Sequence, residues 1–279
     1  MEAIYSILDR LLPFAWAEHE FMKHAFLAVL LMTPMLGMLG TIVVQKKMTF
    51  FSDALGHSAI TGIGIGVVLG VSEINVTMLI FAVIFGLLLN KIKSRQTESA
   101  DTVISVFASC SIAAGLIILS GSGEFNRFSG ILAGDILSIT EREIGYLMLA
   151  FLALWLFWLL GFNQILAVSI HGTLAKSRGI KVKLLDNLFV VLVAVIVTLS
   201  IKCIGILLIN ALLIIPVAAA RNLSANMREY HLFAILFSLF SGMAGLIVSY
   251  YISVATGPMI VLFASVIYFA TLIYSRLLY

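Results

Sequence analysis

The residues best suited to chemistry in this chain stand in one stretch, SDALGHSAITGIGIG, at residues 52–66. Asp53 and His57 are four residues apart, so on a helix they share one face and can reach the same object. The stretch is otherwise apolar enough to cross a bilayer, where an ionisable side chain is costly and usually faces a cavity or a partner. A carboxylate and an imidazole together suit a divalent transition metal. The alternative is a buried Asp–His pair that only ties helices together.

Composition decides what kind of molecule holds these residues. Of the 279 residues 62% are hydrophobic and only 11% are charged, and the mean hydropathy is +1.13. No soluble globular class fits these values. We therefore expect an all-α, polytopic membrane protein with no soluble domain, so that any soluble partner must be another polypeptide.

Hydropathy predicts nine apolar spans, one of them short enough to leave the count at eight or nine transmembrane helices. The predicted spans are 25–44, 53–71, 76–89, 102–119, 144–162, 184–201, 205–220, 232–251 and 258–274. Residues 1–24 mix charged and apolar side chains, which predicts an amphipathic surface segment ahead of a membrane domain at 25–279. The segment 131–140 is short and interrupted by Asp135, which is typical of a re-entrant or interfacial piece.

The distribution of lysine and arginine orients the predicted helices. If the first span begins outside, one side receives 12 of the 17 basic residues, including those of a polar stretch at 163–183. The positive-inside rule makes that side the cytoplasm. With Lys47 at the cytoplasmic boundary, Asp53 and His57 lie roughly 9 and 15 Å along the helix at 1.5 Å per residue. His57 is then near the middle of the bilayer, where a translocation site or a closed gate is expected.

Some enzyme classes are excluded by what the sequence lacks. It contains no GxxxxGK[ST] phosphate loop, so the chain does not bind ATP in that way, and its energy must come from a partner or an ion gradient. It contains no HExxH zinc-hydrolase motif either. Asp135 has no second intramembrane aspartate with which to form an aspartyl protease. We therefore expect a transport subunit rather than an enzyme.

One aspartate and one histidine are too few for a tetrahedral metal shell. A symmetric pair of chains would supply two of each, so we predict a homodimer in which the second span lines a pathway on the twofold axis. Such a site must release its ion and should bind it weakly. The other histidines, His19, His24, His171 and His231, are expected at the surface or in packing roles.

Three stretches together resemble the permease subunits of bacterial ABC importers for zinc, manganese and iron. The first is SDALGHSAITGIGIG, although Thr61 stands where that family often has a proline. The second is NQILAVSIHGTLAKSRGIKVK, in which Ala175 and Gly179 have the family's coupling-helix spacing. The third is IKCIGILLINALLIIPVAAARNL, with Gly205 and Pro216 as the family has them. The likeness covers the chain from about residue 25 to its end.

The resemblance implies a homodimeric or paired permease in the bacterial plasma membrane, with cytoplasmic ATP-binding subunits and an extracytoplasmic metal-binding protein as partners. It implies that Asp53 and His57 contact the ion along the pathway. It also implies that 163–183 contains a short helix that docks on the ATPase. The residues assigned to this coupling are His171, Leu174, Ala175, Arg178 and Gly179.

Membrane lipid is a further expected partner, and we expect no nucleic acid and no permanently bound cofactor, only a transported metal ion. Carboxylate plus imidazole accepts zinc, manganese or iron, so the metal stays open. Two other functions also stay open. One is a stand-alone secondary transporter driven by protons, with Asp53 and His57 as a proton relay, and the other is a membrane scaffold that transports nothing.

Overall fold

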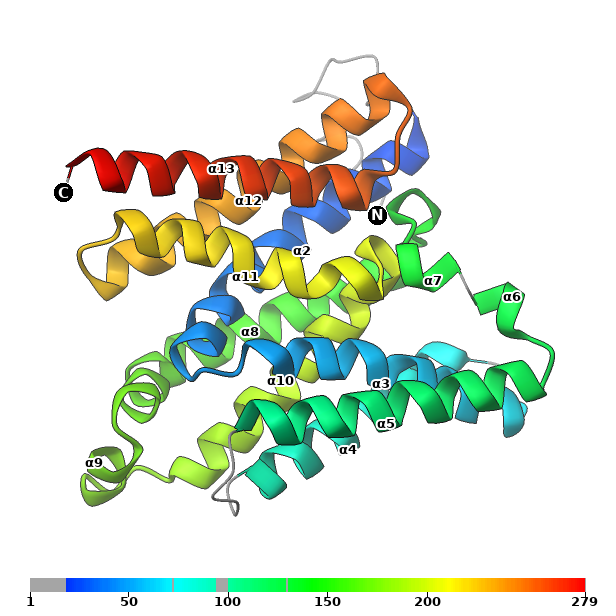
Figure 1. Cartoon of the computed structure of the whole chain (residues 1–279), viewed down its shortest axis with the longest axis horizontal. Coiled ribbons are helices and arrows are strands. Elements are labelled where there is room, and N and C mark those ends of the chain that lie inside the picture. The colour runs from blue at the N-terminus through cyan, green and yellow to red at the C-terminus, as the bar shows by residue number, and fades with distance from the viewer. Residues whose placement is uncertain (1–18, 72, 94–99, 129, 279) are drawn as a thin grey trace.

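Nine long helices make up most of the residues described by this computed structural model, which are 19–71, 73–93, 100–128 and 130–278 (Figure 1). The all-α prediction of about eight or nine spans is confirmed within this part of the chain. The long helices are α2 (Glu20–Gln45), α3 (Thr49–Val68), α4 (Ile74–Lys93), α5 (Ala100–Gly121), α8 (Glu141–Ile170), α10 (Val182–Ile204), α11 (Ile206–Leu223), α12 (Met227–Ile252) and α13 (Thr256–Leu278). The short ones are α6 (Phe125–Phe128), α7 (Gly130–Ala133), the 3₁₀ turn η2 (Ile136–Ser138) and α9 (Gly172–Ser177).

The helix boundaries differ from the predicted spans by a few residues at most ends, and two of the differences change how a predicted segment is interpreted. Helix α2 begins at Glu20, ahead of the predicted start at residue 25, while the rest of the predicted surface segment, up to residue 18, lies outside the described residues. Helix α8 continues to Ile170, so the predicted polar stretch 163–183 begins with two more helical turns. Polar side chains such as Asn163 do not end a helix. The backbone leaves the helical region only at His171.

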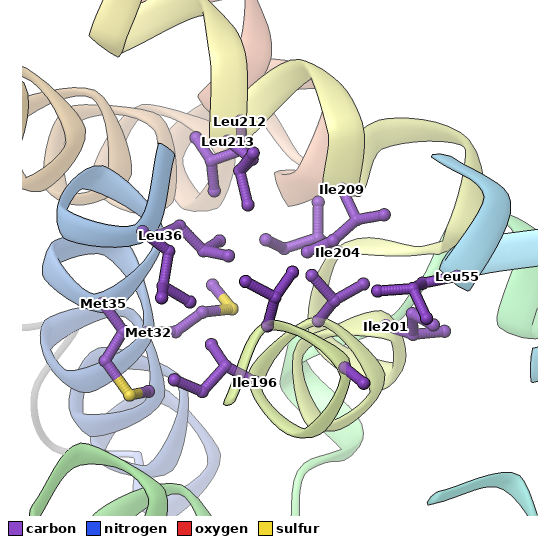
Figure 2. Packing of buried hydrophobic residues seen from close by; sticks show 14 of the residues in the cluster. Met32, Met35, Leu36, Leu55, Ile196, Ile201, Ile204, Ile209, Leu212 and Leu213 are labelled. Carbon is purple, nitrogen blue, oxygen red and sulfur yellow. The ribbon is translucent and has the colours of Figure 1, made fainter. Parts of the chain in front are cut away.

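Helices α2 and α10 form the centre of the bundle. In their most apolar windows, 78% of α2 and 56% of α10 is buried, compared with 28% of α4, α8 and α13. A helix that is apolar on every face is expected in this position. Figure 2 shows Met32 and Leu36 of α2 packed beside Ile204 of α10 and Leu212 of α11.

Helix α3 is held on most of its surface by α4, α5, α10 and α11. Thirteen of its 20 residues are buried. Its contact with α5 is the closest: the Thr61 hydroxyl lies 2.9 Å from the Ser111 hydroxyl, and Gly115 follows one turn later against the Thr61 backbone. Gly64 meets Ile118 further along, so the two helices run parallel. This packing fixes which face of α3 remains open.

The corner between α10 and α11 depends on glycine. Gly205 separates the two helices with φ +96°, a conformation that L side chains rarely adopt. Gly134 lies against it so closely that an added Cβ would come 2.1 Å from the Gly205 nitrogen. The Asp135 amide donates to the Lys202 carbonyl at 3.0 Å. The segment 131–140 is therefore a pair of short turns packed on this corner, and it does not cross the bundle.

Candidate metal site

Asp53 and His57 lie together on the first half of α3. His57 Nε2 is 3.3 Å from Asp53 Oδ2, one helical turn apart. The exposed fraction along this face decreases from 49% at Phe50 to 38% for the Asp53 side chain and 22% for His57. One turn further on, Thr61 is buried. The two ionisable side chains thus occupy an open strip on the first half of a helix that is enclosed around its middle.

The pair has unused ligand capacity. The His57 Nδ1 atom is buried and makes no hydrogen bond to any described residue. The Asp53 carboxylate, which stands one turn away, limits the orientations of the ring. A neutral imidazole offers one lone pair, and a carboxylate offers two oxygens, which are donor types that zinc and manganese accept. Among the described residues no group of three His, Cys, Asp or Glu side chains comes together. Asp53 and His57 alone are too few for a closed metal shell, so a metal site here would need further ligands.

Beyond His57, the α3 side chains Ile60 and Ile63 face an almost entirely apolar pocket. A cavity of only about 10 Å³ lies there, lined by Ile60 and Ile63 of α3, Leu116 of α5, Phe125 of α6 and Ile206 of α11, among others. That volume is at the lower limit for one water molecule. The α3 face is thus accessible over the half that begins at the Lys46–Met48 corner and closed at Ile60 and Ile63, before the helix becomes exposed again at Val68.

Two polar contacts beside this site were missed by the sequence reasoning. The Ser52 hydroxyl donates to Asn210 Oδ1, which joins α3 to α11 next to Asp53. The Thr61 hydroxyl lies against the Ser111 carbonyl and hydroxyl, which joins α3 to α5. Helix α3 is unbroken at Thr61, the position where metal-importer permeases often have a proline. The signal available for the first contact was a single asparagine in the apolar run LLINALL.

The remaining histidines divide as expected for packing and surface roles. His231 is buried between α2 and α12, with Nδ1 2.8 Å from the Met227 carbonyl and Nε2 2.9 Å from the Thr41 hydroxyl. A carbonyl only accepts, so in the neutral ring Nδ1 carries the hydrogen and Nε2 is an acceptor. The single hydrogen of the Thr41 hydroxyl lies between this nitrogen and the Met38 carbonyl, which is 2.6 Å from the hydroxyl oxygen. His19 stacks on Phe21, with ring centroids 5.3 Å apart.

The residues assigned to ATPase coupling gather on and around α9. Ala175 is 2% exposed and anchors the short helix, while Leu174 is 52% exposed and projects from it. His171 is the residue at its start, and the His171 backbone carbonyl accepts a hydrogen bond of 2.9 Å from the Ala175 amide. Arg178 caps its end, and Gly179 follows with φ +80° in a tight turn that leads into α10. Figure 1 shows α9 at the end of the bundle opposite α6 and α7.

Comparison with known proteins places this geometry in context. The sequence profile of the ABC 3 transport family matches residues 18–275. The high-affinity zinc uptake system membrane protein ZnuB of Buchnera aphidicola subsp. Baizongia pistaciae is 27% identical over 87% of this chain and 94% of its own length. The manganese import system permease protein ScaB of Streptococcus parasanguinis is 24% identical over 90% of this chain and 89% of its own length. The structure of PsaBC from Streptococcus pneumoniae in complex with Fab superposes with a TM-score of 0.80, at 24% identity, over 97% of this chain and 95% of the matched one, which shows that the fold is shared.

Proposed function

Because the chain belongs to the ABC 3 transport family, we propose that it is the membrane permease of an ABC importer that moves a divalent transition metal into the cytoplasm. Its relatives include permeases named for zinc uptake and for manganese import, which makes these two metals the leading substrates. Iron(II) is a third candidate, because the same donor atoms accept it. The alternative of a stand-alone proton-driven carrier is not favoured, since these relatives are components of uptake and import systems.

The observation that supports this function most directly is the open strip of α3. An aspartate and a histidine stand side by side on it, and a single chain offers no third ligand of these types within the described residues. A second copy related by a twofold axis would bring two carboxylates and two imidazoles to one point, which is a sufficient set for a tetrahedral or larger shell. We propose that α3 faces its counterpart across such an axis and that the metal passes between them.

Energy for this transport would come from outside the chain. We propose that a cytoplasmic ATP-binding subunit docks on α9, where Leu174 offers an exposed apolar side chain and Ala175 holds the helix in place. ATP binding would then move α9 and the helices joined to it, so that the open strip of α3 faces each side of the membrane in turn. An extracytoplasmic metal-binding protein would deliver the ion to the complex in the bacterial plasma membrane.

Uptake of radioactive zinc, manganese and iron(II) into liposomes tests this function, with the chain reconstituted together with its ATP-binding subunit. Asp53→Ala and His57→Ala should each lower uptake by at least about tenfold, because even the loss of an outer-shell support commonly costs that much in metal affinity or activity. Glu124→Ala removes a carboxylate that pairs with Arg127 outside the bundle core and serves as the control.

Normal uptake in both site variants would refute the metal-contacting role. A second arm omits ATP and the ATP-binding subunit and applies a proton gradient instead. Wild-type uptake in that arm would favour the secondary transporter. Elemental analysis of the purified complex then identifies which metal it retains.

A further inference from the structure

An ion pair joins two corners of the structure that lie far apart in the sequence. The Lys46 ammonium group bonds to the Asp186 carboxylate and also lies 5.2 Å from the centre of the Phe189 ring. The Lys46 side chain is only 11% exposed and that of Asp186 is 30% exposed. A charge so enclosed is costly unless it is paired. The position of Lys46 is therefore tied to the second turn of α10.

On one side, this pair is closely connected to the helix that carries the candidate metal site. Lys46 caps the end of α2, and Lys47 takes the left-handed conformation with φ +52°. The Met48 amide then donates to the Val43 carbonyl at 3.0 Å, which closes the corner just before α3 begins. Asp53 follows five residues after Met48. A displacement of Lys46 must therefore displace the first turns of α3 as well.

On the other side, the pair is connected to α9. The turn from α9 to α10 is held by two bonds to the Ala175 carbonyl, from the Arg178 and Ile180 amides, each at 3.2 Å. Asp186 stands at the second turn of α10, and its neighbour Asn187 accepts a hydrogen bond of 2.9 Å from Asn90 of α4. Figure 1 shows α9, the start of α10 and the α2–α3 corner at the same end of the bundle.

Space for movement exists around the pair. A cavity of about 500 Å³ lies between the end of α8, the start of α9 and the two charged residues, with Ser169, Gly172, Lys46 and Asp186 in its lining. Gly172 opens α9, so the cavity separates the start of that helix from the α2–α3 corner. The ion pair is therefore a specific connection across a region that is otherwise loosely filled.

We propose that the Lys46–Asp186 ion pair is a positioning contact that transmits the movement of α9 and α10 to α3, and so determines when the Asp53–His57 strip opens. This proposal rests on the proposed function, because it assumes that α9 is driven by an ATPase. A pair that only neutralised a lysine at the membrane boundary would affect folding and assembly. A transmitting pair affects how much metal is moved for each ATP hydrolysed.

The test measures metal uptake and ATP hydrolysis in the same liposomes, using the complete complex. Lys46→Met and Asp186→Asn should lower the metal moved per ATP by about fivefold or more, the lower end of usual coupling between sites. ATP hydrolysis itself should continue. The exchange Lys46→Asp with Asp186→Lys should restore the ratio, because it remakes the pair with the charges reversed. Lys47→Gln removes the neighbouring exposed lysine and should leave the ratio unchanged.

Wild-type ratios in both single variants would overturn the proposal, and so would a correctly assembled exchange variant with a low ratio. If the single variants do not assemble, Asp186→Glu decides the question, because it keeps the charge of the pair but moves it by one methylene. A lowered ratio of metal moved to ATP hydrolysed supports the proposal, and a wild-type ratio, which a purely structural pair would also give, overturns it. If the proposed function itself is wrong, the wild-type complex will move no metal when it hydrolyses ATP. That result is distinct from a changed ratio in the variants.

Discussion

Replacing Gly115 with alanine should weaken the packing that holds α3 in place. A Cβ at this position would lie 2.6 Å from the Thr61 nitrogen and 2.9 Å from the Ile60 carbonyl carbon. Ordinary contact begins at 3.4 Å, so α5 and α3 would have to separate by about 0.8 Å. The atoms that clash are backbone atoms, which cannot rotate away as the end of a side chain can. Overpacking of this kind typically costs about 1–3 kcal/mol.

The same displacement would reach the candidate metal site. Thr61 lies one turn after His57, and its hydroxyl is held by Ser111, so separation of the helices strains this contact as well. Metal–ligand distances are usually satisfied only within about 0.2 Å. A shift of α3 by several tenths of an ångström therefore exceeds what a metal shell built across two copies would tolerate. Metal uptake should fall even in complexes that remain folded.

Thermal unfolding of the purified protein in detergent measures the first effect, and liposome uptake measures the second. A loss of about 2 kcal/mol corresponds to a decrease in melting temperature of roughly 4–8 °C, from the scaling known for soluble domains of 150–250 residues. Gly121→Ala is the matched control, because it lies on the same helix and an added Cβ meets nothing within 4 Å. If the Gly115→Ala and Gly121→Ala variants have the same melting temperature and Gly115→Ala transports metal normally, the packing argument is wrong.

Three further predictions concern other contacts of the bundle. Ala175→Arg should prevent copurification of the ATP-binding subunit, because the 2% exposed Ala175 side chain leaves no space for arginine and α9 must move. Thr41→Val should destabilise the protein by about 1–3 kcal/mol, because it leaves the buried Nε2 of His231 without a donor; thermal unfolding measures this change. Lys202→Met should lower the melting temperature, because the Glu143 side chain, only 14% exposed, loses an ammonium partner at 2.7 Å.

Each of these predictions has a control that separates it from general damage. Thr41→Ser keeps the hydroxyl and should melt like the wild type, so equal destabilisation in both variants would contradict the hydrogen-bond argument. Lys202→Met combined with Glu143→Gln should recover most of the loss, since the second change removes the uncompensated charge. Leu174→Ala shortens an exposed side chain of α9 without moving the helix, so it should weaken copurification less than Ala175→Arg does. Wild-type copurification with the Ala175→Arg variant would argue against docking at α9.

The helices could be predicted from the sequence because each leaves a continuous apolar signal, and the spacing of Asp53 and His57 sufficed to place them on one face. Helix ends were less certain. Hydropathy decreases at Asn163, yet the hydrogen-bonded backbone of α8 continues to Ile170, since a polar side chain at the membrane boundary does not interrupt it. The role of Asp53 and His57 as metal contacts remains a prediction.

Contacts between distant residues could not be predicted from one sequence. Lys46 and Asp186 are separated by 140 positions, and Thr61 and Ser111 by 50. Each residue alone has an ordinary explanation, as a boundary charge or a small polar side chain in a helix. Which two of them meet depends on helix order and rotation in the bundle, and a single sequence contains no periodic signal for either.

The enclosure of α3 has a consequence for how the chain is built into a membrane. Helix α3 is not among the seven described helices that are long and apolar enough to cross a bilayer on their own, yet it lies within the bundle. A helix that carries Asp53 and four glycines gains too little from lipid to leave the translocon alone. During synthesis α3 should therefore enter the bilayer only once α4 and α5 have emerged, and this part of the protein should insert as a group rather than one span at a time.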